Sequence, residues 1–133
     1  MTRFAIDPPT LLRLVEEDVE VDPKHQLVAP NLIRSQALDL LLARVQSGEM
    51  SESSAIALHE RMTELKMRLL GDRVSRRTAW KIALANGWTT IQDAEYLAVT
   101  ILQADFLIAT NLELAKKAGG VVALANFEDL NNL

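Results

Sequence analysis

The sequence predicts an α/β fold of three layers (α/β/α), in which helices cover both faces of a short, mostly parallel sheet. Short apolar runs that suit buried strands alternate with longer segments of helical apolar spacing, and Pro, Gly and Asn residues separate them. Strands that alternate with helices pair in parallel through right-handed crossovers. The 133 residues fit a single domain, 1–133, and the 49% of apolar residues can form a core.

The first half of the chain is expected to form two strands and three helices. Residues 3–6 are apolar and end at Asp7-Pro8-Pro9, which predicts a short strand followed by a helix, because proline suits the first helical turn. Residues 26–29 suit a second strand. Helical spacing starts again at Pro30 and stops at Gly48, and Ser51 suits the N-cap of a third helix that extends to residue 65.

The second half repeats the alternation. Residues 66–70 suit a short strand, and Ser75 is expected to cap a helix that stops at Asn86-Gly87. A further helix begins at Thr89 or Thr90 and carries Asp93 in its first turn, where the helix dipole favours a negative charge. Residues 106–109 suit a buried strand, 111–118 a short helix, 121–124 a final strand, and 126–133 a polar tail.

Charge and composition narrow the classes of function. The net charge is −4, and an acidic chain is a poor general binder of nucleic acid because phosphate affinity comes mostly from Lys and Arg. No apolar run is long enough to cross a membrane, so we expect no membrane association. The absence of cysteine excludes disulfides and thiolate metal sites and fits a cytoplasmic protein.

One local cluster of cations departs from the acidic balance. Arg73, Arg76, Arg77 and Lys81 are close together in sequence, in the expected helix after Gly71-Asp72. The ordinary interpretation is a solvated helix start. The alternative is contact with RNA, for which Arg76 and Arg77 are the candidates.

Four polar side chains fall where a parallel sheet places its ligands, beyond the carboxyl ends of the strands. Asp7 follows the first strand and Asn111 follows residues 106–109, while Gln36 and Asp93 lie on helices that can border the same crevice. Oxygen-bearing side chains of this kind suit Mg²⁺ or Mn²⁺. A metal held there could activate water for phosphate hydrolysis.

At these residues the chain resembles the PIN-domain family, and within it the VapC-type toxins of bacterial toxin–antitoxin pairs. The resemblance covers most of the chain, in an ordered series of five stretches: residues 4–7, 27–30, 77–87, 93–98 and 106–111. It implies a Mg²⁺- or Mn²⁺-dependent endoribonuclease that cleaves RNA, is restrained by a small antitoxin protein, and forms a homodimer. It also implies that the segment before Leu27 is short by one helix.

The same resemblance shows where this chain departs from the family. Asp7 and Asp93 match the family's acids as they stand, whereas Gln36 falls where the family has Glu and Asn111 falls where it has Asp. Amides keep the size and one oxygen of the acids but carry no charge, which weakens the attraction for a divalent ion and relieves repulsion between carboxylates. Asp39 lies one helical turn from Gln36 and is a candidate substitute ligand; a solvated or structurally paired acid is the alternative.

Two functions of different classes remain open. The first is a metal-dependent ribonuclease, weakened or intact, in which Asp7 and Asp93 are catalytic and hold the metal with Asp39. The second is a non-catalytic PIN-like domain that binds a protein partner or itself.

Overall fold

The computed structural model describes residues 1–131 and contains a parallel sheet of four strands in the order β3-β2-β1-β4. The strands are β1 (Thr2–Ile6), β2 (His25–Pro30), β3 (Arg68–Leu70) and β4 (Phe106–Ile108). The register places Phe4 beside Leu27 on one side and beside Phe106 on the other. The parallel sheet that the alternating pattern predicted is therefore confirmed.

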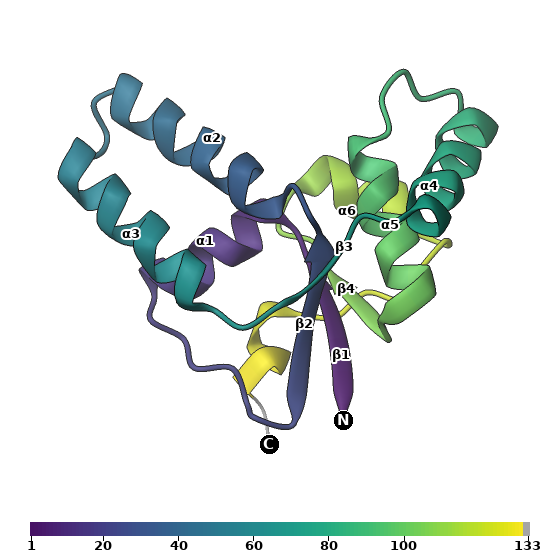
Figure 1. Cartoon of the computed structure of the whole chain (residues 1–133), viewed down its shortest axis with the longest axis horizontal. Helices are drawn as coiled ribbons and strands as arrows, with labels where there is room; N and C mark the ends of the chain where they lie inside the picture. The colour runs from purple at the N-terminus through teal and green to yellow at the C-terminus, as the bar shows by residue number, and fades with distance from the viewer. Residues whose placement is uncertain (132–133) are drawn as a thin grey trace.

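Helices form the two outer layers (Figure 1). On one side of the sheet lie α1 (Pro8–Glu16), α2 (Ile33–Gln46) and α3 (Glu52–Glu64). On the other side lie α4 (Arg73–Asn86) and α5 (Gln92–Gln103), with α6 (Leu112–Ala118) beside α5. The chain is thus a three-layer α/β/α fold, as expected.

Short polar side chains begin four of the helices. Asp7, Ser51, Asp72 and Asn111 each accept a hydrogen bond from the backbone N–H three residues later, which satisfies a donor that the first helical turn leaves free. The prediction that Ser75 caps α4 was wrong. Asp72 is the cap, and Ser75 lies buried in the first turn, where its N–H donates to Asp72 over 2.8 Å.

Two other predictions differ from the structure at the C-terminal end. Residues 121–124 form no strand and touch the sheet through a single bridge between Leu107 and Leu124. The polar tail contains a 3-10 helix, η1 (Phe127–Asn131). Its Phe127 and Leu130 are buried, so two apolar residues at a spacing of three anchor this segment to the core. Residues 132 and 133 of the tail lie outside the described residues. Within residues 1–131 no helix lies between α1 and β2, as the resemblance implied.

The core lies between the sheet and the helices. Ile6, Leu11, Leu14, Val28 and Leu97 are among the side chains that are almost completely buried there. Their burial fixes the strands and the first turns of α1 and α5, which carry the candidate site. Among residues 1–131 no helix is both long and apolar enough to cross a bilayer.

Candidate functional site

The predicted site residues do come together. A pocket of about 280 Å³ lies beyond the carboxyl ends of β1 and β4. Asp7, Gln36, Asp93 and Asn111 all line it, and so does Asp39. The rule that parallel sheets place their ligands at this edge therefore located the crevice correctly. The roles of these residues in metal binding or catalysis stay predictions.

Asp7 is fully buried and both of its carboxylate oxygens accept hydrogen bonds. Oδ1 accepts from the backbone N–H of Thr10 over 3.0 Å and from the Thr10 hydroxyl, and Oδ2 accepts from the backbone N–H of Asn111 over 2.9 Å. A carboxylate offers about four acceptor positions, so three are in use. Asp7 thus joins the start of α1 to the start of α6 and has a structural role of its own.

Asp93 forms an ion pair with Lys117. The Nζ atom of Lys117 lies 2.7 Å from Asp93 Oδ2 and 4.9 Å from the ring centroid of Trp88, and this hydrogen bond to Asp93 raises the pKa of the Lys117 ammonium. Both side chains are about one third exposed, so the pair is partly screened by solvent. The ammonium neutralises the second acid of the crevice.

The two amides also have internal partners. The hydroxyl of Tyr96 donates to Gln36 Oε1, and Tyr96 is only 3% exposed, so burial raises the pKa of its phenol far above the ordinary value. Asn111 Oδ1 accepts from the backbone N–H of Leu114 over 3.1 Å and thereby caps α6. The oxygens that the amides offer to the crevice are therefore engaged.

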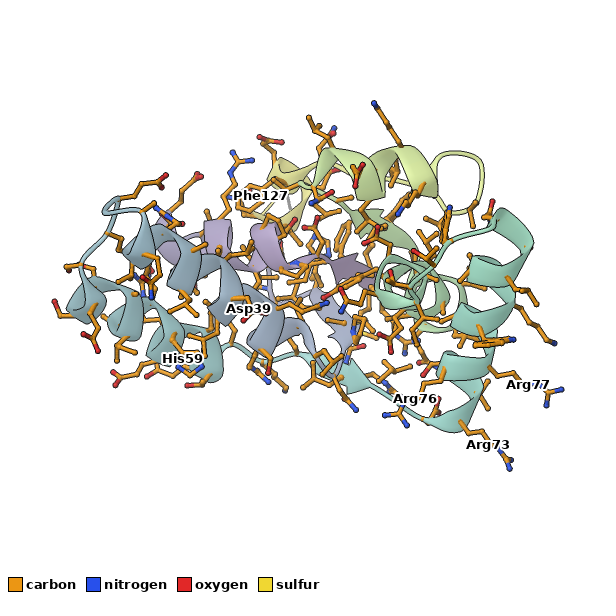
Figure 2. All side chains as sticks on the ribbon, turned by 90° about the horizontal axis from the view of Figure 1, so that it is seen from above. Asp39, His59, Arg73, Arg76, Arg77 and Phe127 are labelled. Atoms are coloured by element: carbon orange, nitrogen blue, oxygen red, sulfur yellow. The ribbon has the colours of Figure 1, made fainter. Side chains whose placement is uncertain are left out.

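The two remaining acids near the crevice differ in placement. Asp39 is exposed on α2, where Figure 2 labels it, and it lines the pocket, as expected for a candidate ligand. Glu95 does not line the pocket; its partial burial raises the pKa of its carboxyl, against a smaller opposing effect from Arg76.

The donor set does not fit a divalent ion bound as tightly as four carboxylates would bind it. Asp7 has most of its acceptor positions filled, Asp93 already has a cation beside it, and the amide oxygens accept protein donors. Within residues 1–131 no three His, Cys, Asp or Glu side chains are gathered closely enough to hold a metal. Hard divalent cations need several free, preferably anionic, oxygens.

Three residues of this network were not predicted from the sequence: Thr10, Tyr96 and Lys117. Thr10 and Tyr96 carry a sequence signal, since each lies three residues after a predicted site acid: Thr10 after Asp7, the cap of α1, and Tyr96 after Asp93 in α5. Lys117 carries none. Its pairing with Asp93 depends on how α6 packs beside α5, which no local pattern reveals.

The predicted RNA contacts lie on a different surface, the outer face of α4. Arg73, Arg77, Trp80 and Leu84 recur at spacings of three and four and so share one face of the helix, where Trp80 is 61% and Leu84 is 69% exposed. Figure 2 shows Arg73, Arg76 and Arg77 pointing outward at the end of the molecule remote from Asp39. None of the α4 cations forms an ion pair within the described residues, whereas Arg13, Arg44 and Arg61 do.

Two solved structures share the fold of this chain. PAE2754 from Pyrobaculum aerophilum aligns with 97% of this chain and 92% of its own, with a TM-score of 0.74 and 21% sequence identity. VapBC-1 from nontypeable Haemophilus influenzae aligns with 95% of this chain and 98% of its own, with a TM-score of 0.60 and 15% identity. No protein-family model and no curated protein matches the sequence.

Likeness at these identities shows the fold. The name VapBC-1 agrees with the VapC type that the sequence resembles, and the PIN-like fold implied by that resemblance is confirmed.

Proposed function

We propose that this chain is a non-catalytic PIN-like domain that binds RNA on the outer face of α4. The first half of this proposal, the absence of catalysis, rests on the hydrogen bonds and the ion pair that the polar groups of the crevice already form inside the protein. Each of its four diagnostic positions already has a partner inside the protein: Thr10 and Asn111 for Asp7, Lys117 for Asp93, Tyr96 for Gln36, and the start of α6 for Asn111. A metal would have to displace Lys117 and compete with these donors.

The unpaired cations of α4 support the second half. Residues 73–86 contain four cations and no acid in a chain of net charge −4, so the positive charge is concentrated on one helix. Arg76 lies close enough to Glu95 to attract its carboxylate, whereas Arg73 and Arg77 form no ion pair within residues 1–131 and remain free to contact phosphates. Trp80, exposed on the same face, offers a surface on which a base can stack.

Fluorescence anisotropy with a labelled twelve-residue single-stranded RNA at low salt tests this proposal. Arg77→Gln should weaken binding and reduce the salt slope by about 0.7, the value for one phosphate contact with a single strand. Arg61→Gln is the matched control, because it removes the same charge from an arginine that is paired with Asp18. Equal effects of the two changes, or no binding at all by the parent, would refute RNA contact through α4.

The same RNA, followed on a denaturing gel with millimolar Mn²⁺, tests the absence of cleavage. The RNA should stay intact. Cleavage that disappears in Asp93→Asn would belong to this chain and would show that the non-catalytic interpretation is wrong.

A weakened ribonuclease is the second candidate, because three carboxylates, Asp7, Asp39 and Asp93, line one pocket. Under that interpretation Asp39→Asn lowers a measurable cleavage rate. Under the non-catalytic proposal there is no rate to lower.

A protein partner is a further part of the proposal. The likeness to VapBC-1 supports a small antitoxin-like partner. The family resemblance supports a homodimer, and the absence of cysteine fits a cytoplasmic protein. Light scattering of the purified chain, alone and with the product of a neighbouring small gene, distinguishes a monomer, a homodimer and a complex.

A further inference from the structure

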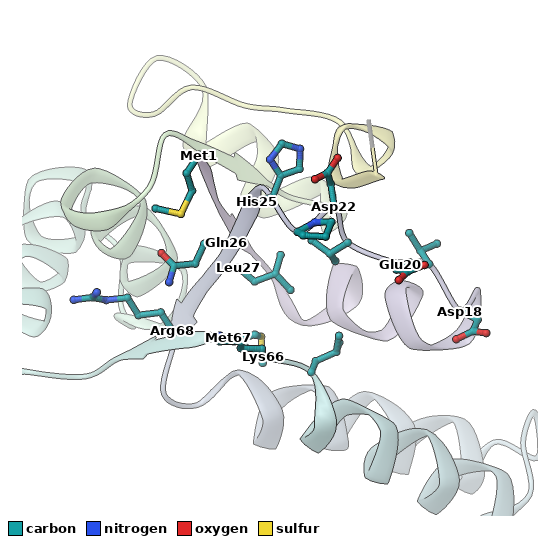
Figure 3. A pocket seen from close by; sticks show the side chains of 14 residues that line it. Met1, Asp18, Glu20, Asp22, His25, Gln26, Leu27, Lys66, Met67 and Arg68 are labelled. Atoms are coloured by element: carbon teal, nitrogen blue, oxygen red, sulfur yellow. The ribbon is translucent and has the colours of Figure 1, made fainter. Parts of the chain in front are cut away.

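A larger hollow, of about 910 Å³, lies at the other end of the sheet, where β1 and β2 begin (Figure 3). It borders a gap beside residues 25–27 of β2, because β3 pairs with residues 28–30 of that strand. Charges of both signs line the hollow: Asp18, Glu20 and Asp22 on the one hand, Lys66 and Arg68 on the other. This mixed lining favours neither a cation nor an anion, whereas the smaller crevice presents a more definite set of polar groups.

The amides of the crevice present N–H groups rather than oxygens. Gln36 Oε1 accepts from the Tyr96 hydroxyl, and Asn111 Oδ1 accepts from the backbone N–H of Leu114. The side-chain NH2 group of each amide is left over, and within residues 1–131 neither group has an acceptor. Both residues line the pocket. Where the family resemblance places two acids, this chain thus offers two hydrogen-bond donors.

Asp39 adds a free carboxylate to the same pocket. It is exposed, and among the described residues it forms neither a hydrogen bond nor an ion pair. Asp39 lies three residues after Gln36 on α2, so their Cβ atoms are about 5–6 Å apart and their end groups can reach one edge of the same ligand. A carboxylate accepts two hydrogen bonds side by side, and the amide next to it donates one.

The walls of the pocket suit a flat, uncharged ring. Pro8 and Pro9 line it from the start of α1, Leu40 from α2 and Leu114 from α6. Its volume of about 280 Å³ lies just below the range of roughly 300–1,000 Å³ that is usual for small-molecule sites, so it suits one heterocyclic base better than a whole nucleotide. Proteins read an extruded base by hydrogen bonds to its Watson–Crick edge while apolar side chains hold its faces.

We propose that the crevice binds guanine, with Asp39 accepting from N1–H and the 2-amino group while the NH2 group of Gln36 donates to O6. The Watson–Crick edge of guanine carries two adjacent donors beside an acceptor, which matches this pair of side chains. Asn111 offers a second donor for O6 or N7, the acceptors of the neighbouring edge. The inference deepens the proposed function by giving an RNA-binding domain a base preference, and it rests on that function only where the guanine belongs to RNA.

The polar groups of the crevice favour guanine over other occupants. Asp7, Asp39 and Asp93 line the pocket and repel a phosphate. A metal ion or an ammonium group is attracted to Asp39, but it leaves the NH2 groups of Gln36 and Asn111 without acceptors. Adenine, cytosine and uracil each present a single donor on the Watson–Crick edge, so none of them can donate twice to Asp39.

A nucleoside titration of the intact, ¹⁵N-labelled chain tests the site without any phosphate. The probes are guanosine, inosine, which lacks the 2-amino group, and adenosine. We expect guanosine to shift the side-chain amide resonances of Gln36 and Asn111 in NMR spectra. Inosine should bind about tenfold more weakly, the size expected for one lost hydrogen bond to a carboxylate, and adenosine should cause no shift.

A matched pair of variants assigns the contact to Asp39. Asp39→Asn removes the charge and one acceptor, so it should weaken guanosine binding about tenfold or more and bring guanosine and inosine to nearly the same affinity. Glu64→Gln, an equal change of charge at an exposed position on α3 outside the pocket, should change both affinities less than about twofold. A purely structural role of Asp39 would leave the preference for guanosine over inosine in place.

Single-stranded RNA identifies the source of the guanine. Two labelled twelve-residue RNAs, one of adenosine alone and one with a single central guanosine, are compared by fluorescence anisotropy. If the guanine belongs to RNA, the second RNA binds more tightly, Asp39→Asn removes the difference, and Arg77→Gln weakens both RNAs alike. If guanosine binds but the two RNAs are equal, the crevice takes a free nucleoside. Failure of Arg77→Gln to weaken RNA binding concerns α4 alone.

Three results would overturn the proposal. The first is an NMR spectrum that does not change in saturated guanosine. The second is equal binding of guanosine, inosine and adenosine, which indicates stacking without recognition of the base edge. The third is an equal effect of Asp39→Asn and Glu64→Gln on guanosine binding.

Discussion

Two of the hollows in this molecule lie at opposite ends of the same sheet and differ in how their polar groups are satisfied. In the crevice beyond the carboxyl ends, Asp7, Gln36, Asp93 and Asn111 all have partners inside the chain. In the gap beside the first half of β2, Asp22 and Gln26 each keep a buried oxygen without one. These four polar groups, at the edge of the sheet where parallel folds bind ligands, thus have partners inside the chain. The buried acceptors without a donor, Asp22 Oδ2 and Gln26 Oε1, lie at the other end of the sheet.

Removal of the two buried aspartates should give the largest contrast between the hollows. Asp7→Ala removes the cap of α1 and leaves the N–H of Asn111 without its acceptor, and we expect a loss of about 3 kcal/mol in the free energy of unfolding. Asp22→Ala removes one hydrogen bond but also a poorly satisfied charge, so the loss should stay below about 1 kcal/mol. Urea denaturation measures both.

Equal losses of stability at Asp7 and Asp22 would contradict the comparison.

The expected loss of stability in Asp7→Ala also affects how an activity assay of that variant is interpreted. A loss of activity in Asp7→Ala could come from unfolding of the site or from removal of a catalytic group. Asp93→Asn is therefore the better test of catalysis.

Tyr96 gives a contrast of intermediate size that depends on pH. Its folded pKa is raised above the unfolded value near 10, so the stability it contributes is present below pH 10 and is lost as the pH rises further. Tyr96 is the single tyrosine of the chain, so Tyr96→Phe isolates the effect. Above pH 10 the parent should lose up to about 1.4 kcal/mol per pH unit relative to the variant.

The comparison is made by urea titration of parent and variant between pH 8 and 11. Parallel stability curves over that range would show that the Tyr96 hydroxyl ionises freely, and the internal bond to Gln36 would then be too weak to occupy the crevice.

Glu95 should give the smallest effect. Partial burial raises the pKa of its folded form, so its neutral form contributes stability below the unfolded pKa, and this contribution is lost as the pH rises through the folded pKa. Glu95→Gln should therefore raise the melting temperature slightly at pH 7 and leave it unchanged near pH 3. A lower melting temperature at pH 7 would mean that the attraction of Arg76 outweighs the effect of burial.

The sequence was sufficient for the architecture because the alternating apolar runs and the cap at Ser51 are local signals. It was also sufficient to place Asp7, Gln36, Asp39, Asp93 and Asn111 around one crevice, since parallel strands end at one edge. It was insufficient for residues 121–124, where an apolar run forms only one bridge because Val121 and Val122 donate to Ala118 in the turn that ends α6.

The sequence also did not reveal which residues distant from one another in the chain become partners. Lys117 approaches Asp93 from another helix, and the gap beside residues 25–27 depends on the register at which β3 joins β2. Both are results of tertiary packing. The sequence alone therefore located the crevice, whereas the hydrogen-bond and ion-pair partners of its residues could be found only in the structure.

A melting titration with Mn²⁺ tests the central claim, that internal partners have replaced the metal in the crevice. The parent should melt at the same temperature with and without millimolar Mn²⁺. The triple variant Gln36→Glu, Asn111→Asp and Lys117→Gln frees Asp93 and restores two charges, and at 100 times its Kd the ion should raise its melting temperature by about 8 °C. The double variant Gln36→Glu with Asn111→Asp, which retains Lys117, should show a smaller rise in melting temperature with Mn²⁺. A clear rise for the parent itself would contradict the account.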